Sequence, residues 1–494
     1  MTERAFDGLL RQPTRIRRFR SHATQHAVVL AILPIIAGTI SLALTKTEYR
    51  YLAAPVLTMV SLAAIYTAVL WNRDRRLPVF EVGSLWVAST VVYSALPFVT
   101  FMAMGLRWSP LGDSRLLAYE FNVQEIGAFA WRHVVYLASF ICVYLALRGR
   151  RAARSAPLNA IPSQLITALA VILVFQYAFK WAMSYGYGLD LDISYSDMSV
   201  LVSRVASTPI LLLQITLIIL ASILLVKQAL LLVLIQQWRS LKWRIALVAW
   251  LAIETVTVVV RMGGRGQAVR LILAFAVLYD RFARPLRAKW IMGGGALLLT
   301  GFIVQGDLRS ALSQRELSAA SVLTSANEFE ALFATAYDIY KRKEVGNLGV
   351  VPWQVYVSDL YILIPRQLLP FEKIDPSEWY LGVIGARGTG VGFMFGVMSQ
   401  AVLGLDWIEL GFRGAILGLL LAGFHRWYVR YCRSFWVTLF YLFIAIWIYY
   451  TFRATSFWLI HFIVYQFIPV VLSARIIEYS LSRWPKRIAL EAGA

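Results

Sequence analysis

Charged residues are scarce in this chain, and acidic residues are the scarcest of them. Only 15% of the 494 residues are charged, 27 acidic and 48 basic, whereas 59% are hydrophobic. The mean hydropathy is +0.64. About a quarter of the residues in a soluble domain are charged, so this composition excludes an ordinary soluble fold. It indicates an all-α polytopic membrane protein.

The chain also lacks the features of several other protein classes. Its two cysteines, Cys142 and Cys432, lie in or beside apolar segments, and neither belongs to a CxxC or Cys/His group. A disulfide framework and a zinc site are therefore not indicated. We find no Walker loop, hydrolase triad or haem pattern. No internal repeat is visible, so a transporter built from inverted repeats gains no support.

The net charge of +21 has a distribution that is typical of membrane proteins. In a soluble chain such a charge would indicate nucleic-acid binding, but here the arginines gather in short clusters between apolar runs. We therefore expect no nucleic-acid partner. The basic N-terminus precedes an apolar run without an Ala-x-Ala cleavage site, which indicates a retained signal-anchor helix.

Apolar runs long enough for helices of roughly 20 residues predict about 12 membrane spans. These runs are Ala27–Leu44, Tyr51–Trp71, Val82–Met104, Ala128–Leu147, Ile161–Met183, Pro209–Ile235, Arg244–Val260, Gly266–Arg281, Trp290–Gln305, Glu409–Phe424, Phe435–Phe452 and Phe457–Ala474. Between them lies one long polar loop, Gly306–Leu410. The chain is thus divided into N-terminal helices (1–305), the loop (306–410) and C-terminal helices with a tail (411–494).

Helical periodicity within the loop predicts a helix over Arg315–Lys343 that lies along the membrane surface. From Gly346 onward, prolines and glycines indicate an irregular loop folded over a cavity. We interpret Val391–Leu405 as a re-entrant or surface helix. This choice returns the later basic clusters to the same side as the earlier ones.

The positive-inside rule then orients the chain. With the arginine-rich N-terminus inside, both termini are cytoplasmic and the long loop lies outside. The clusters that this arrangement places inside are Arg73/Arg75/Arg76, Arg148/Arg150/Arg151/Arg154, Arg239/Lys242/Arg244, Arg281/Arg284/Arg287/Lys289 and His425–Arg433.

The turn Arg261-Met-Gly-Gly-Arg265-Gly-Gln-Ala-Val-Arg270 is a candidate anion site on the outer side. Its glycines let the backbone approach a ligand, and the following helix N-terminus favours a phosphate or pyrophosphate. The alternative is a tight turn between two helices, whose arginines extend toward the outer lipid headgroups. Further outward cations come from the loop: Arg309, Arg366, Lys373 and Arg387. Glu254, the one acid well inside a span, is expected to pair with Arg261 or Lys227.

Three short stretches resemble the Wzy-type oligosaccharide repeat-unit polymerases, which extend O-antigens, capsules and exopolysaccharides. They are Gly263-Gly-Arg265-Gly, Ile364-Pro-Arg366-Gln-Leu-Leu-Pro370-Phe-Glu-Lys373 and Gly411-Phe-Arg-Gly414-Ala-Ile-Leu-Gly-Leu-Leu-Leu-Ala-Gly423. The resemblance implies a GT-C-like fold in the bacterial inner membrane.

The resemblance also implies an activity, in which a glycan moves from undecaprenyl diphosphate to a lipid-linked repeat unit without metal or other cofactor. Arg265, Arg366 and Lys373 match the family's cations. The family's carboxylate is not at its usual spacing, so Asp406 and Glu409, which flank that position, are the candidate catalytic acids. Membrane lipid, the lipid-linked oligosaccharide and a chain-length regulator are the implied partners.

Two other functions fit the same sequence. An O-antigen ligase would use the same donor with a lipid A acceptor, and a lipid-linked oligosaccharide flippase would transport the substrate without chemistry.

Overall fold

The computed structural model describes the chain in segments, and every regular element in the described part is a helix. These segments are residues 39–40, 49–74, 79–104, 122–149, 158–187, 210–238, 240–260, 265–284, 286, 290–291, 293–295, 328–361, 363–364, 368–385, 395–456 and 458–491.

Seven of the described helices are long and apolar enough to cross a membrane. They are α2 (Arg50–Asp74), α3 (Val82–Met104), α4 (Val123–Leu147), α5 (Ser163–Tyr187), α7 (Ile210–Gln236), α17 (Trp407–Tyr431) and the continuous run of α20 (Trp458–Phe462), η6 (Ile463–Phe467) and α21 (Ile468–Glu491). The chain is therefore a polytopic membrane protein, as its composition predicts.

The remaining predicted spans carry charged residues, form shorter helices or lie largely outside the described residues. Helix α8 (Leu241–Val260) forms as expected but carries Lys242, Arg244 and Glu254, and α9 (Arg265–Leu278) has only 14 residues before a π-helical turn. Helix α18 (Phe435–Trp447) has 13 residues. Ala27–Leu44 and Trp290–Gln305 fall largely outside the described residues.

Helix α4 is packed between α2 and α17. Glycines on α17 allow this close approach. A Cβ atom added at Gly414 would lie 2.5 Å from the carbonyl oxygen of Tyr136, and one at Gly418 would lie 2.9 Å from that of Phe140. Small residues at this spacing let membrane helices pack backbone to backbone. Two glycines of the third family-like stretch therefore have a packing role.

Three hydrogen bonds gather the predicted inner loops at one end of the bundle. The Arg73 guanidinium donates to the Leu145 carbonyl at 2.6 Å, and Arg281 donates to the carbonyl of Cys432 at 3.1 Å. The Asn159 amide donates to the Arg433 carbonyl at 2.9 Å. These basic loops thus share one side, as the positive-inside argument requires.

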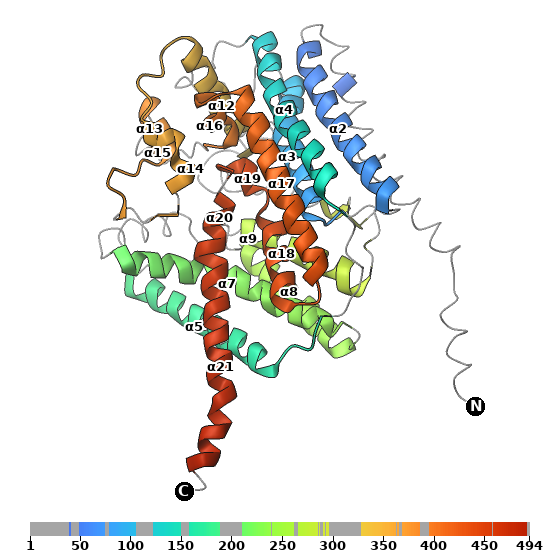
Figure 1. The fold of residues 1–494 in the computed structure, drawn as a ribbon, viewed down its shortest axis with the longest axis vertical. Helices are drawn as coiled ribbons and strands as arrows, with labels where there is room; N and C mark the ends of the chain where they lie inside the picture. Colours follow the sequence, from blue (N-terminus) through green and yellow to red (C-terminus); the bar gives the residue numbers. More distant parts are fainter. Residues whose placement is uncertain are drawn as a thin grey trace, which may run out of the picture.

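The described part of the long loop gathers at the opposite end (Figure 1). Helices α12 (Glu328–Glu344) and α16 (Val397–Leu403) pack together there, beside the N-terminal end of α17. Helix α16 has seven residues, all of them buried. Because a span needs roughly 20 residues, α16 does not cross the membrane.

The helix predicted over Arg315–Lys343 forms in its described part, α12, whereas residues 315–327 lie outside the described residues; α12 is covered by protein and does not lie open on a surface. Nearly all of α12 from Phe329 to Ile339 is buried in the bundle. The Phe333 ring packs edge-on against Phe98 of α3, 4.9 Å between centroids. The buried carboxylate of Asp338, also on α12, accepts from Arg342 at 2.7 Å and from the Tyr380 hydroxyl at 2.8 Å. Polar residues that would have faced water are instead paired within the protein, so amphipathic spacing alone does not give the position of the helix.

The arrangement makes a topological prediction. Single cysteines at Asn347 and Arg430, introduced after Cys142 and Cys432 are replaced by alanine, should be labelled from opposite sides of intact membranes. Both positions are exposed, one in the turn after α12 and the other in the last turn of α17. Labelling of both from the same side would contradict the arrangement. Lys343 is unsuitable, because its ammonium group binds the carbonyls that end α16.

Candidate functional site

A cavity of about 420 Å³ opens at the loop end of the bundle. One wall comes from α14 (Ser358–Tyr361) and the segment that enters α15 (Pro376–Val383); the other comes from α19 (Tyr450–Arg453) and α20. The cavity lies within the range of small-molecule sites, about 300–1,000 Å³. Its lining includes three basic side chains (Lys373, Arg453, His461) and four aromatic ones (Tyr361, Phe395, Tyr450, Trp458).

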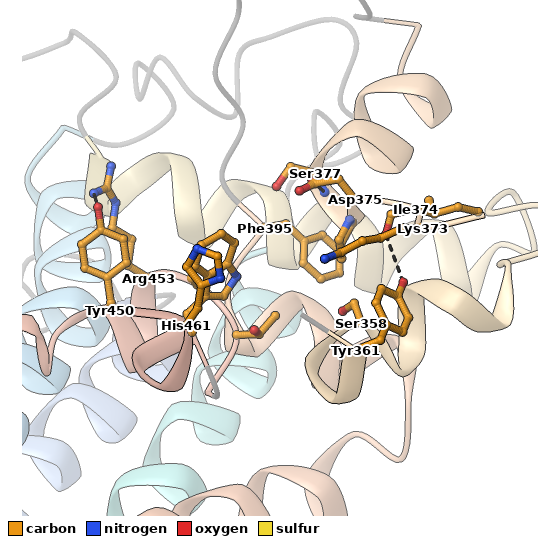
Figure 2. A pocket seen from close by; sticks show the side chains of 14 residues that line it. Ser358, Tyr361, Lys373, Ile374, Asp375, Ser377, Phe395, Tyr450, Arg453 and His461 are labelled. Carbon is orange, nitrogen blue, oxygen red and sulfur yellow. Dashed lines mark hydrogen bonds between the residues drawn. The ribbon is translucent and has the colours of Figure 1, made fainter. Parts of the chain in front are cut away.

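Two of the cations lie on opposite walls, with Phe395 and His461 between them (Figure 2). The Lys373 ammonium donates to the carbonyl of Ile364 at 3.3 Å. Burial lowers the pKa of Lys373 below its ordinary value, and the nearby Asp375 opposes that change. The Arg453 guanidinium lies 5.0 Å from the centre of the Tyr450 ring and donates to its hydroxyl at 2.8 Å.

Local sequence explains how the wall that carries Lys373 is held. Asp375 caps α15, and its carboxylate accepts from the amides of Ser377 at 2.7 Å and Glu378 at 3.2 Å. Pro376 at the first helical position suits this cap. The carboxylate beside Lys373 is thus held by backbone amides but keeps its negative charge, so the lining combines the cations Lys373 and Arg453 with one acid.

Tyr361 also holds the wall that carries Lys373. Its hydroxyl contacts the carbonyl oxygens of Gln354 and, at 3.2 Å, Ile374. Burial raises the pKa of Tyr361 to about 12. The phenol therefore stays protonated at neutral pH and keeps the segment that carries Lys373 against α14.

The structure brings two of the predicted cations to this region. Lys373 lines the cavity, and Arg270 lies close by, its guanidinium 4.1 Å from the centre of the Trp447 ring. That ring lies 5.1 Å from Tyr450 of the cavity wall. Arg265 is the first residue of α9, but its side chain lies outside the described part. Arg261, Arg309, Arg366 and Arg387 also lie outside the described residues.

The predicted acids occupy a different place, at the turn between α16 and α17. Asp406 accepts two hydrogen bonds from Arg132, at 2.7 and 2.5 Å. Its φ of 56° is the one positive value among the described non-glycine residues. Glu409 accepts from Arg413 at 2.7 Å and from the Leu405 amide at 3.0 Å. Neither acid lines the cavity, and this geometry favours a clamping role for both.

The structural role of the Asp406–Arg132 ion pair can be tested by replacing each partner. Asp406→Asn and Arg132→Gln each remove the same charge-assisted pair, so each should lower stability by roughly 1.5–3 kcal/mol and reduce activity to the same small extent. Thermal unfolding of the purified variants measures the first effect. If Asp406→Asn abolished activity at parental stability while Arg132→Gln kept activity, Asp406 would take part in the chemistry instead.

Arg453 and His461 were missed by the sequence reasoning. Arg453 carried a usable signal, because it lies between two apolar runs on the side of the long loop, where basic residues oppose the positive-inside bias. His461 is a lone histidine without a recognisable catalytic spacing, and one wall of the cavity, with Lys373, comes from a distant part of the chain.

Two other features of the described region bear on the chemistry. Glu254 was predicted to pair with Arg261 or Lys227, and the pair with Lys227 is confirmed, with 2.6 Å between the ammonium nitrogen and a carboxylate oxygen. Among the described residues, no three His, Cys, Asp or Glu side chains come together in a group that could hold a metal ion.

Comparisons with known proteins identify no relative of this chain. No family model, curated protein or solved structure matches the chain significantly. Its function is therefore argued from the site and from the motifs.

Proposed function

We propose that this protein is a polysaccharide polymerase of the Wzy type in the bacterial inner membrane. It would transfer a growing glycan from undecaprenyl diphosphate to a lipid-linked oligosaccharide repeat unit. The observation that carries this proposal is the cavity, in which Lys373, Arg453 and His461 lie among aromatic rings. The basic loops collect at the other end of the bundle, so the positive-inside rule supports an outward position for the cavity and cytoplasmic positions for both termini.

The lining suits a diphosphate-linked glycan. The ammonium and guanidinium groups stabilise the negative charge of the leaving diphosphate, which is the main task of a catalyst for this transfer. Aromatic rings offer flat apolar surfaces for the C–H faces of sugars. Arg270, next to Trp447, extends the cationic region toward the N-terminal end of α9.

The bond changes balance without a cofactor. An acceptor hydroxyl oxygen attacks the anomeric carbon of the donor glycan, the bond from that carbon to the diphosphate oxygen breaks, and the diphosphate keeps the electron pair. A base must take the hydroxyl proton. His461 is the imidazole in the cavity lining. We assign it this role, because Asp406 and Glu409 are engaged in ion pairs elsewhere.

The decisive experiment compares the glycans of cells with and without the protein. Loss of a polymerase leaves single repeat units on the final acceptor. Loss of a flippase leaves none exported, and loss of a ligase leaves polymer that is not attached to lipid A. The purified protein in vesicles, given lipid-linked repeats, should then make long chains. Normal chain length without the protein would refute the proposal.

A further inference from the structure

The segment from Trp353 to Pro370 exposes apolar side chains although it belongs to the polar loop rather than to a membrane span. The exposed residues described in this segment are Trp353, Tyr356, Leu360, Ile364, Leu368 and Pro370. Leu360 and Leu368 are 75% and 74% exposed. We call these six residues the apolar face. A segment immersed in water would not expose large apolar residues alone, so another medium must cover this face.

The chemistry of the surface changes abruptly where the apolar face ends. From 371 to 378, the exposed residues are Glu372, Asp375 and Glu378, all of them acidic. An apolar band bordered by charged residues, with a tryptophan in the band, is the pattern of a protein surface at a membrane–water boundary.

An ion pair sets the depth of the segment relative to the nearest span. Asp359 of α14 accepts from Arg413 of α17 at 2.8 Å. Arg413 lies in the second turn of α17, which has 25 residues and is therefore about 37 Å long. Since the hydrocarbon core is about 30 Å thick, the second turn lies within the outer part of that core when α17 is centred on it. Helix α17 itself exposes Ile408 and Phe412 at this level.

Other contacts hold the segment rigidly at this depth. The side-chain amide of Gln400 on α16 donates to the Tyr356 carbonyl at 3.1 Å. On the inner side of α14, Ser358 and Tyr361 line the cavity, whereas Leu360 points away from the protein. The segment is thus a thin wall with the cavity on one side and the apolar face on the other.

We propose that the apolar face is immersed in the bilayer leaflet on the loop side, where it contacts the acyl chains of membrane phospholipids. The described residues of this segment, 353–361, 363–364 and 368–370, then form a membrane-embedded wall of the cavity and not a water-exposed loop. The ion pair to α17, the apolar residues that α17 exposes at the same level and the acidic border all point to lipid as the occupant. This assignment does not depend on the polymerase function.

Fluorescence quenching in vesicles tests the proposal on the full chain. A single cysteine at Leu360, with Cys142 and Cys432 replaced by alanine, carries an environment-sensitive dye after reconstitution into phosphatidylcholine–phosphatidylglycerol vesicles. A lipid with a nitroxide near its headgroup should quench this dye several-fold more than a dye at Asn347, and aqueous iodide should do the opposite. Phe412, an exposed residue in the second turn of α17, is the positive control for lipid contact at this depth.

Two results would overturn the proposal. Equal quenching by iodide at Leu360 and Asn347 would place the apolar face in water. No quenching at Leu360 by either agent would mean that protein covers it, for example a second copy. Leu368→Cys provides an independent site if Leu360→Cys fails to fold, because its side chain is equally exposed.

Discussion

Replacing Arg148 with methionine should lower the free energy of unfolding by about 3–5 kcal/mol, the usual cost of removing one partner from a buried ion pair. Arg148 is fully buried at the end of α4 and contacts the buried Glu81 and the largely buried carboxylate of Asp74. Its guanidinium lies 2.6 Å from Asp74 and also contacts Glu81. The methionine fills similar space but leaves both carboxylates buried without their cation.

The surrounding contacts explain why the cost cannot be relieved locally. Glu81 also accepts from the Tyr144 hydroxyl at 2.5 Å, and the imidazole of His425 lies 3.7 Å from its second oxygen. Burial opposes ionisation of Glu81, but His425 and Arg148 together lower the pKa of its carboxyl. The acid therefore stays charged at neutral pH, and neutralising it after Arg148 is lost requires a proton.

Thermal unfolding of the purified protein in one detergent measures the effect. Arg430→Met is the matched control, because Arg430 is exposed at the same end of the bundle and should be nearly silent. The double variant Arg148→Met/Glu81→Gln should recover part of the loss, since it removes one stranded charge. If Arg148→Met unfolded at the parental temperature, the buried cluster would not be what holds these helix ends together.

Low pH should weaken the ion cluster of Arg148, Glu81 and Asp74. A carboxyl whose pKa is lowered on folding contributes stability that is fully present above its unfolded pKa, about 4.3 for glutamate, and is lost as the pH falls through the lower folded value. We expect the parent protein to lose stability below about pH 4.3, and a Glu81→Gln variant to lose less over that window. Unfolding midpoints across this range provide the measurement.

The sequence predicted the spans well where apolar length alone decides the outcome. Five of the seven long helices begin and end within about five residues of the apolar runs that define them. The other two begin where predicted but end later: α17 continues past Phe424 to Tyr431, and α21 continues past Ala474 to Glu491. Intramembrane pairing was also readable, since a lone acid such as Glu254 needs a cation within reach.

Tertiary arrangement could not be read from the sequence. Helix α12 is amphipathic, yet it lies inside the bundle because its acids find partners from other elements, such as Tyr380 for Asp338. Asp406 and Glu409 were chosen for their distance from a motif, whereas the structure ties each to an arginine. One of these arginines, Arg132, lies far away in the sequence. Long-range pairs of this kind have no local signature.

Replacing either cavity cation with glutamine should reduce polymerisation of lipid-linked repeats by roughly 30- to 1,000-fold, which corresponds to about 2–4 kcal/mol of transition-state stabilisation. Lys373 and Arg453 lie on opposite walls of the cavity, so each can meet a different part of an extended anionic group. Neither change should lower stability by a comparable amount, because both side chains are only partly buried, whereas Arg148 is fully buried.

Arginine and lysine at position 453 should support different rates of polymerisation. Arg453→Lys keeps the charge but loses the planar fork that binds two phosphate oxygens at once, so its rate should fall between those of the parent and Arg453→Gln. Initial rates with purified protein and a single lipid-linked repeat measure the effect. Arg475→Gln is the control, since Arg475 is exposed on α21 and pairs with Glu478 of the same helix. Parental rates for both Lys373→Gln and Arg453→Gln would show that the diphosphate is held elsewhere, and Arg265→Gln at the start of α9 would then be the next variant to measure.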